Sequence, residues 1–265
     1  ARGVFMNVLV CVKQGPEDED LKLDPVTKTL IRTQGTGRIS EYDKYALEIA
    51  LKLKEDTGGE VTAITMGPPA SENVLKYCLS VGADEVYLLS DRAMGGADAY
   101  ATVNTLAAAK EYLEKMKGAA FNLILLGKQA SDSDTSLVMP ELAEALGYPQ
   151  MTFVVDYKLD SDALYVCRET DKGTEEYKVA TPVVMSVGKT PFPARYPTIK
   201  LKLAANRKTV PSLSAEALGL DPLNIGVKGS KTTVGASYFP EASKEGVRIE
   251  EASGEAAAKK LAEII

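Results

Sequence analysis

Apolar segments alternate with helix-like segments along the first half of the chain. The apolar runs are MNVLVCVK at residues 6–13, VTAITM at 61–66, EVYLLS at 85–90 and FNLILL at 121–126. Strands that are apolar on both faces are typical of a parallel sheet covered by helices on both sides. The alternation therefore predicts an α/β fold with a Rossmann-like, mostly parallel sheet.

The segments between these runs predict the covering helices. Apolar residues recur on one face of residues 42–56 and 71–81, and residues 98–116 are rich in alanine. After Gly147 the pattern changes to MTFVVDYKL, LYVCRET and EEYKVATPVVMSV, with polar turns between the strand-like runs. Such a series is typical of β-hairpins, so we expect an antiparallel extension of the sheet.

A second change in composition occurs near residue 188. We expect an α/β nucleotide- or flavin-binding domain over residues 6–187, and we interpret residues 1–5 as extraneous residues ahead of a native start at Met6. In residues 188–265, Pro and Gly are frequent and few apolar residues could bury one another, which predicts an extended C-terminal arm on a partner's surface. An alanine-rich helix at residues 254–264 ends this arm. The apolar side chains that argue against a plain disordered tail are Tyr196, Ile199, Leu201, Leu203, Tyr238 and Phe239.

Charge and composition argue against several functions. A net charge of −6 over 265 residues is unfavourable for nucleic-acid binding, which requires a clustered basic face. The chain contains no histidine, which removes Ser–His and Cys–His catalysis and His-ligated zinc. Cys11, Cys78 and Cys167 lie far apart in apolar surroundings, so we expect neither a disulfide nor a thiolate metal site. No apolar run approaches the roughly 20 residues of a membrane span, so we expect a cytoplasmic protein without membrane insertion.

Distinctive loops follow the four predicted strands. They are KQGP at residues 13–16, MGPP at 66–69, SDRAMGGADAYAT at 90–102 and GKQASDSDT at 127–135. Open parallel sheets bind ligands at the carboxyl ends of their strands, where these loops meet. Glycines let the backbone approach a ligand, and hydroxyls with exposed N–H groups bind phosphate oxygens. Because the spacing G-x-x-x-x-G-K-[ST] is absent, the residues indicate a phosphate group without identifying the ligand.

The aspartates of these loops have further interpretations. Asp134 or Thr135 can cap the helix that follows the fourth loop, and Asp98 can cap the helix that follows the third. The aspartates of the fourth loop could instead hold Mg²⁺, but a magnesium site needs several converging oxygens and the sequence has no second cluster of them. We therefore expect no metal site.

Six segments occur in the order found in the beta subunit of electron transfer flavoprotein. They are LVCVKQGP, ALEIALKLKE, VTAITMGPP, CLSVGADEVYLLSD, LILLGKQASDSDTS and PARYPTIKLKLAANRK. The chain resembles this family from Met6 to the C-terminal helix. The resemblance implies an adenine-nucleotide-binding α/β domain, a heterodimer with an alpha subunit, and a C-terminal arm that wraps that partner.

Two segments resemble the electron-bifurcating members of the family in particular. They are DPVTKTLIRTQG at residues 24–35 and SDRAMGGADAYAT at 90–102. This resemblance implies that the chain holds FAD, which accepts hydride from NADH. One electron then passes to ferredoxin or flavodoxin, and the other passes through the FAD of the alpha subunit to a flavin-dependent dehydrogenase of the acyl-CoA or 2-hydroxyacid type. The cofactor carries the chemistry, so we expect no catalytic side chain.

The family's binding positions transfer to this chain residue by residue. Cys11 matches the adenine contact of the first strand, and Arg92 could face flavin carbonyls or a phosphate. The cofactor-binding residues that the resemblance implies are Cys11, Ser40, Glu41, Tyr42, Asp43, Met66, Gly67, Asp91, Arg92, Gly95, Gly96, Ala97, Asp98, Thr102, Gly127, Lys128, Gln129, Ala130, Ser131, Asp132, Ser133, Asp134 and Thr135. The usual Asn-Pro before the first helix is Ser40-Glu41 here, so some side-chain contacts differ from the family's.

A loop in the second half of the chain resembles the one that docks acyl-CoA dehydrogenases. Arg195 and Tyr196 match its Arg-Tyr pair, and Ile199 matches its apolar anchor. The usual Asn-Glu-Pro before this pair is replaced by Pro193-Ala194, which leaves the identity of the dehydrogenase open.

Three other functions remain compatible with the sequence. The chain could be a conventional family member that holds AMP as a structural ligand. It could be a non-redox module that binds ATP as a homodimer. It could also be an ATP-pyrophosphate hydrolase, because GGADA resembles the S-G-G-x-D-S loop of such enzymes, although Met94 replaces the leading serine.

Overall fold

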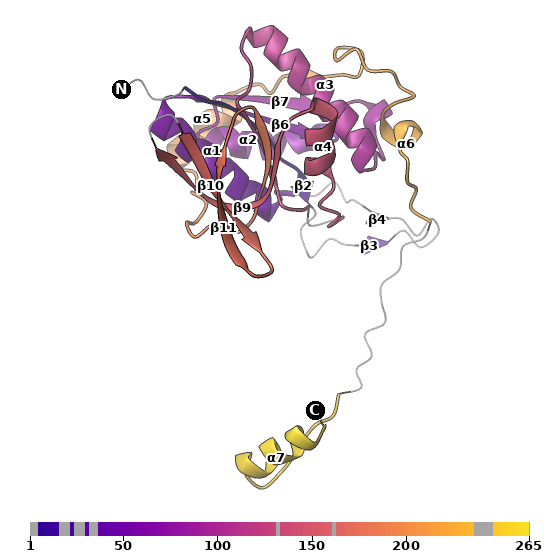
Figure 1. Cartoon of the computed structure of the whole chain (residues 1–265). Helices are drawn as coiled ribbons and strands as arrows, with labels where there is room; N and C mark the ends of the chain where they lie inside the picture. The colour runs from indigo at the N-terminus through magenta and orange to yellow at the C-terminus, as the bar shows by residue number, and fades with distance from the viewer. Residues whose placement is uncertain are drawn as a thin grey trace.

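The computed structural model describes residues 5–15, 37–130, 133–160, 163–235 and 246–264, together with the backbone of 22–23 and 30–31. These residues form a nine-stranded mixed sheet with helices on both faces (Figure 1). The predicted α/β fold class is therefore confirmed. No helix in this described part of the chain combines the length and the apolar character that a membrane span needs.

Parallel strands run from the middle of the sheet to one of its edges. In spatial order they are β12 (Val183–Val187), β8 (Leu123–Gly127), β1 (Asn7–Cys11), β6 (Glu60–Met66), β7 (Glu85–Leu89) and β13 (Ser212–Leu213). The four apolar runs of the sequence become β1, β6, β7 and β8. Most of their residues are buried whichever face they point to, as a sheet covered on both sides requires.

Three longer strands extend the sheet beyond β12. They are β9 (Gln150–Asp160), β10 (Ala163–Thr170) and β11 (Gly173–Val179). β10 is antiparallel to both of its neighbours, which confirms the antiparallel extension, whereas β9 is parallel to β12. The segment EEYKVATPVVMSV divides at Pro182, which has no N–H to donate to a ladder. Its second half becomes β12, whose fully buried residues lie between β9 and β8.

Helices cover the two faces of the sheet. α1 (Glu41–Thr57), α2 (Glu72–Val81) and α5 (Ile199–Arg207) lie on one face, and α3 (Ala99–Lys117) and α4 (Val138–Leu146) lie on the other (Figure 1). Each face has a separate cluster of buried side chains, one of which contains Leu47 and Leu75 and the other Leu113 and Leu142. The shorter elements are β2 (Gln14–Gly15), paired with β5 (Arg38–Ile39), β3 (Lys22–Leu23), paired with β4 (Leu30–Ile31), and the 3-10 helices η2 (Pro69–Ser71) and η3 (Arg92–Met94).

α4 begins later than the sequence predicts. Its first residue is Val138, and Leu137 at the cap position provides no side-chain hydrogen bond. Asp134 and Ser136 adopt left-handed backbone conformations, with φ of 55° at each, which interrupt a right-handed helix. The prediction that Asp134 or Thr135 caps this helix is therefore wrong.

Much of the chain beyond residue 188 packs on the α/β domain. α5 packs against α2, β13 pairs with β7 at the edge of the sheet, and α6 (Gly226–Gly229) contacts η3. These parts are folded rather than extended. The predicted terminal helix is present as α7 (Gly254–Ile264) and buries none of its residues, whereas Tyr238 and Phe239 lie outside the described residues. That an arm lies on a partner stays a prediction.

Candidate functional site

The carboxyl ends of β8, β1, β6 and β7 meet at one edge of the sheet, because these strands are parallel neighbours in that order. The loops after them are the four that the sequence singles out. The segment at residues 40–43, which begins α1, contacts the ends of β1 and β8. The structure therefore brings most of the predicted binding residues to one edge.

Asp43, in the first turn of α1, joins the ends of β1 and β8. Its carboxylate oxygens accept hydrogen bonds from the backbone N–H groups of Lys13 at 2.7 Å and of Gly127 at 2.8 Å. Burial raises the pKa of the Asp43 carboxyl to about 7, although both hydrogen bonds and the charge of Lys13 act to lower it. A side chain at Gly127 would collide with the Asp43 carboxylate and with the backbone of Tyr42, so this position requires glycine.

The other predicted binding residues near Asp43 differ in burial, and burial affects the protonation of Cys11. Burial, and then the negative charge of Asp43, raises the pKa of the Cys11 thiol, which is therefore neutral at physiological pH. Ser40 is also buried, and its Oγ donates to the Gln129 carbonyl at 3.5 Å. Glu41 is exposed and Tyr42 is half-buried. The contact of Cys11 with an adenine ring stays a prediction.

The predicted phosphate loop, residues 127–135, is open to solvent at its described end. Ser133, Asp134 and Thr135 are exposed, so both hydroxyls can reach a ligand. Ser131 and Asp132, at the centre of the predicted cradle, lie outside the described residues.

The first residues of the phosphate loop are attached to the sheet. The Lys128 N–H donates to the Val187 carbonyl at 2.8 Å, and the Lys128 ammonium lies 4.7 Å from the centre of the Phe153 ring. The Ala130 carbonyl accepts a hydrogen bond from the Asp134 N–H at 3.0 Å. The lysine is thus held by an aromatic ring at the base of the loop.

A cavity of about 510 Å³ opens between the loops that follow β6 and β7. Residues 67–69 line one side, and residues 90–92, 94 and 95 line the other. Its volume lies within the roughly 300–1,000 Å³ of typical small-molecule sites. Arg92 is exposed, and although its carbonyl accepts a hydrogen bond from the Gly95 N–H at 3.2 Å, its guanidinium forms no hydrogen bond or ion pair with any residue that the structure describes.

Sequence reasoning did not assign Gln14 and Ser71, which connect two of the loops. The Ser71 Oγ donates to Gln14 Oε1 at 2.6 Å, and this bond links the loop after β1 to the turn after β6. A Cβ at Gly67, next to the half-buried Met66, would meet the Ser71 hydroxyl, so the turn is closely packed. Their positions in the sequence could have identified them, because both residues closely follow strands of the parallel sheet, where ligands bind.

Residues 90–98, which we call the 90–98 loop, hold most of the binding residues predicted after β7. Gly96 has a φ of 69°, a left-handed conformation that glycine adopts readily. Ala97 is half-buried, and the Thr102 N–H donates to the Asp98 carbonyl at 3.0 Å in the first turn of α3. Asp91 and Asp98 both accept several hydrogen bonds within the chain, so the loop has a defined shape beside the cavity.

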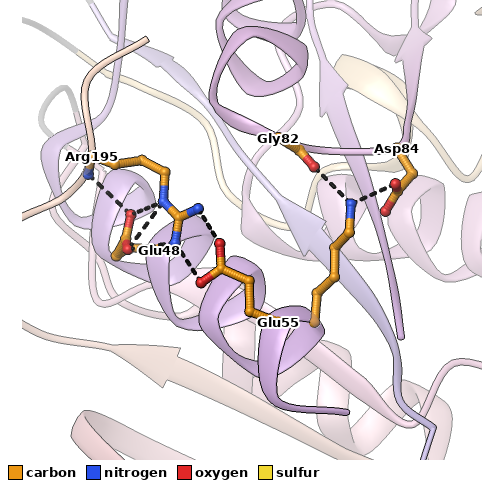
Figure 2. A network of polar contacts seen from close by, with 6 residues as sticks. Glu48, Glu55, Gly82, Asp84 and Arg195 are labelled. Carbon is orange, nitrogen blue, oxygen red and sulfur yellow. Dashed lines mark hydrogen bonds and ion pairs between the residues drawn. The ribbon is translucent and has the colours of Figure 1, made fainter. Parts of the chain in front are cut away.

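The 190–199 loop contains the three residues predicted to dock a partner, and Arg195 is bound within the chain (Figure 2). Its guanidinium donates to Glu48 from Nε and Nη2, at 2.9 Å each, and to Glu55 from Nη1 at 2.6 Å. Both glutamates belong to α1, and the side chain of Glu48 is only 8% exposed. In contrast, Tyr196 is 90% exposed and Ile199 is 81% exposed. Arg195 therefore holds the loop, while these two apolar side chains point outward.

Comparisons with known proteins identify the family. Residues 27–218 match the family described as electron transfer flavoprotein domain. The electron transfer flavoprotein subunit beta of Thermoanaerobacterium thermosaccharolyticum is 43% identical over 242 residues, which are 91% of each chain. Its namesake from Clostridium acetobutylicum is 41% identical over 253 residues, 96% of this chain and 95% of the relative. The caffeyl-CoA reductase-Etf complex subunit CarD of Acetobacterium woodii is 38% identical over 245 residues, 92% of each chain. The chain therefore belongs to the electron transfer flavoprotein family, as a beta subunit.

Proposed function

We propose that this beta subunit holds FAD at the carboxyl edge of its sheet and takes part in electron bifurcation. Bound there, FAD would supply the redox chemistry, namely acceptance of a hydride from NADH and release of its two electrons singly, one to ferredoxin or flavodoxin and one, through the alpha-subunit FAD, to a flavin-dependent dehydrogenase. The side chains of this chain bind and orient the cofactor. None of the described residues needs to act as a nucleophile or base.

The cavity of about 510 Å³ between the loops after β6 and β7 carries the proposal. The phosphate loop follows β8, and both β1 and β6 lie between β8 and β7 in the sheet. Because neighbouring strands are about 4.8 Å apart, the phosphate loop after β8 and the middle of the cavity between β6 and β7 are separated by roughly 12 Å along the edge. A dinucleotide reaches across such a span more readily than a mononucleotide, which favours FAD over AMP.

The residues along this edge suit the parts of FAD. Ser133 and Thr135 offer hydroxyls to phosphate oxygens. Gly67 and Gly95 border the cavity without side chains, so a flat ring could approach their backbone. The Arg92 guanidinium has no partner among the described residues and is available to a flavin carbonyl or a phosphate oxygen.

The names of two relatives support an acyl-CoA dehydrogenase as the partner. CarD belongs to a caffeyl-CoA reductase-Etf complex, and a relative from Anaerotignum propionicum, 35% identical, is named acryloyl-CoA reductase electron transfer subunit gamma. Both names associate a protein of this kind with reduction of a CoA ester. We propose that Tyr196 and Ile199 dock such a dehydrogenase, or one that acts on a 2-hydroxyacid.

Nucleotide counting tests the proposal directly. The purified heterodimer with its alpha subunit is denatured, and the released FAD and AMP are quantified by chromatography. We expect two FAD molecules per heterodimer and no AMP. One FAD with one AMP would show the conventional member of the family instead, and ATP alone would indicate a non-redox nucleotide-binding module.

A paired variant tests the assignment of the phosphate loop. Ser133→Ala with Thr135→Val removes two exposed hydroxyls, and the loss of two hydrogen bonds worth about 1 kcal/mol each should weaken FAD binding in this chain about 30-fold. Thr170→Val is a matched control, because the Thr170 hydroxyl donates to Gly173 in the distant β10–β11 hairpin. Equal FAD affinity in both variants would exclude these hydroxyls as phosphate ligands.

A further inference from the structure

The 90–98 loop is held by residues 215–232, a segment that lies more than a hundred residues later in the chain. At its start, Asp91 Oδ1 accepts a hydrogen bond from the Ala93 N–H at 2.9 Å, and Asp91 Oδ2 accepts one from the Ala215 N–H at 3.1 Å. Ala215 lies two residues after the end of the edge strand β13, and it is 5% exposed. The first aspartate of the loop is therefore attached to the edge of the sheet.

Asp98, at the other end of the loop, has two different sets of partners. Its Oδ1 accepts from the Ala101 N–H at 2.9 Å and caps α3, as the sequence predicts. Its Oδ2 accepts from the N–H groups of Lys231 at 2.7 Å and Thr232 at 2.8 Å, and from the Thr232 hydroxyl at 3.0 Å. Burial alone would raise the pKa of Asp98, but the hydrogen bonds from these groups hold it below its ordinary value.

The middle of the loop fits closely against the same segment. The Gly95 carbonyl accepts a hydrogen bond from the Val227 N–H at 3.2 Å. A Cβ at Gly96 would lie 2.5 Å from a Val227 methyl group, and a Cβ at Gly226 would collide with the Ala93 carbonyl. Both glycines are in the left-handed region, so neither position accepts a larger residue without strain.

The segment has its own attachments on either side of these contacts. The Asp98 N–H donates to the Ser230 Oγ at 2.9 Å, and the Asn104 side chain donates to the Asn224 carbonyl at 2.9 Å. The Lys231 ammonium lies 5.0 Å from the centre of the Tyr100 ring. The contacts thus run along the loop and the first turns of α3.

We propose that residues 215–232 are a positioning element of the cofactor site, and that Asp91 and Asp98 act through it as positioning residues rather than as cofactor ligands. Their carboxylate oxygens already accept hydrogen bonds from within the chain. What the aspartates fix is the backbone of Gly95 and Gly96 beside the cavity. The effect on FAD rests on the proposed function, whereas the effect on loop shape does not.

Asp98→Asn separates the two roles of Asp98, which are the contacts of its Oδ2 with Lys231 and Thr232 and the capping of α3 by its Oδ1. Asparagine caps helices as well as aspartate does, so α3 keeps its cap through the amide oxygen. The amide nitrogen would then face three donors in place of the carboxylate oxygen. We expect amide hydrogen exchange in residues 93–98 of the holo heterodimer to accelerate about 10-fold, as loss of a charge-assisted contact implies. FAD binding in this chain should weaken by a similar factor, while the alpha-subunit FAD is retained.

Two further variants complete the test. Thr232→Val removes a single donor and should produce a smaller change of the same kind. Asp221→Asn is the matched control, because Asp221 accepts a hydrogen bond from the Leu223 N–H within the segment and should leave the 90–98 loop unchanged.

The outcomes are distinguishable. Unchanged exchange in the 90–98 loop of Asp98→Asn would overturn the proposal. Loss of FAD with unchanged exchange would also overturn it, because Asp98 would then contact the cofactor directly. If the unmutated heterodimer released AMP from this chain, the proposed function would fail, but the exchange rates would still decide whether the segment positions the loop.

Discussion

The 90–98 loop and the 190–199 loop are both fastened by carboxylates, but the donors differ. On the 190–199 loop, Glu48 and Glu55 bind the guanidinium of Arg195, so that opposite charges meet. On the 90–98 loop, Asp91 and Asp98 accept hydrogen bonds mainly from backbone N–H groups, which carry no net charge.

This difference determines which side chains each loop leaves available. Because Arg195 is engaged in ion pairs, the 190–199 loop presents the apolar side chains of Tyr196 and Ile199. Because backbone amides satisfy the Asp91 carboxylate, the side chain of its neighbour Arg92 is left without a partner among the described residues, and Arg92 lines the cavity. In the 190–199 loop the cation is used up in ion pairs and apolar side chains are exposed. In the 90–98 loop backbone N–H groups bind the carboxylates, and the cation stays exposed.

The largest expected effect on stability comes from Asp43, a third carboxylate that accepts hydrogen bonds from backbone N–H groups. Its raised pKa makes this effect depend on pH. Its pKa is raised to about 7 from an ordinary 3.8, so the folded state favours the protonated carboxyl. The contribution of Asp43 to stability is therefore fully present below about pH 4, falls as the pH rises through about 7, and is constant above that. Over the whole window the change is on the order of 4 kcal/mol. Urea unfolding of the heterodimer between about pH 5 and pH 8 measures the slope.

Asp43→Asn is the comparison for this measurement, because it removes the titration. The difference in unfolding free energy between the unmutated protein and the variant should shift in favour of the variant as the pH rises. The contribution of Glu55 to stability depends on pH in the opposite direction. The hydrogen bond from Arg195 lowers the pKa of Glu55, so this contribution is lost as the pH falls. Parallel pH profiles for the two proteins would contradict the assignment to Asp43.

Arg195→Ala tests the ion-pair side of the comparison. The change leaves the buried Glu48 carboxylate without its cation, which is costly in a protein interior. Because the Arg195 side chain is 31% exposed, solvent screening reduces the cost to about 2 kcal/mol of unfolding free energy. Amide exchange in the 190–199 loop should rise in the same variant.

Lys54→Ala is the matched control for Arg195→Ala. Lys54 lies on the same helix as Glu48 and Glu55. It forms an ion pair with Asp84, in which the two side chains are 29% and 35% exposed. We expect its loss to cost about 1 kcal/mol or less and to leave exchange in the 190–199 loop unchanged. Equal effects of the two substitutions on that loop would show that Arg195 does not hold it.

Tyr77→Phe gives the smallest expected effect. The Tyr77 hydroxyl donates to the Arg195 carbonyl at 3.4 Å, a long hydrogen bond that supplements the ion pairs. Its removal should lower the unfolding free energy by about 0.5 kcal/mol. A larger loss than that of Arg195→Ala, measured by urea unfolding under the same conditions, would mean that the hydroxyl rather than the guanidinium anchors the loop.

Much of the fold could be predicted because its signals are local. The runs that become β1, β6, β7 and β8 are apolar throughout, and α1, α2 and α3 lie close to their predicted bounds. The start of α4 could not be predicted, because the left-handed backbone at Asp134 and Ser136 arises from the course of the loop and not from its composition. β13 was missed for a similar reason, since two residues at the edge of a sheet show no periodicity.

The sequence by itself determined that four loops share one edge of a parallel sheet, because strands joined by helical crossovers run parallel and so have their carboxyl ends at the same edge. It also determined the cap of α3, which depends on a contact within one helical turn. Only the tertiary structure decided that the second oxygen of Asp98 binds Lys231, and that Arg195 binds Glu48, across 133 and 147 residues of chain. A backbone N–H has no signature in a sequence. For that reason a carboxylate that holds a loop and one that binds a cofactor look alike until the chain is folded.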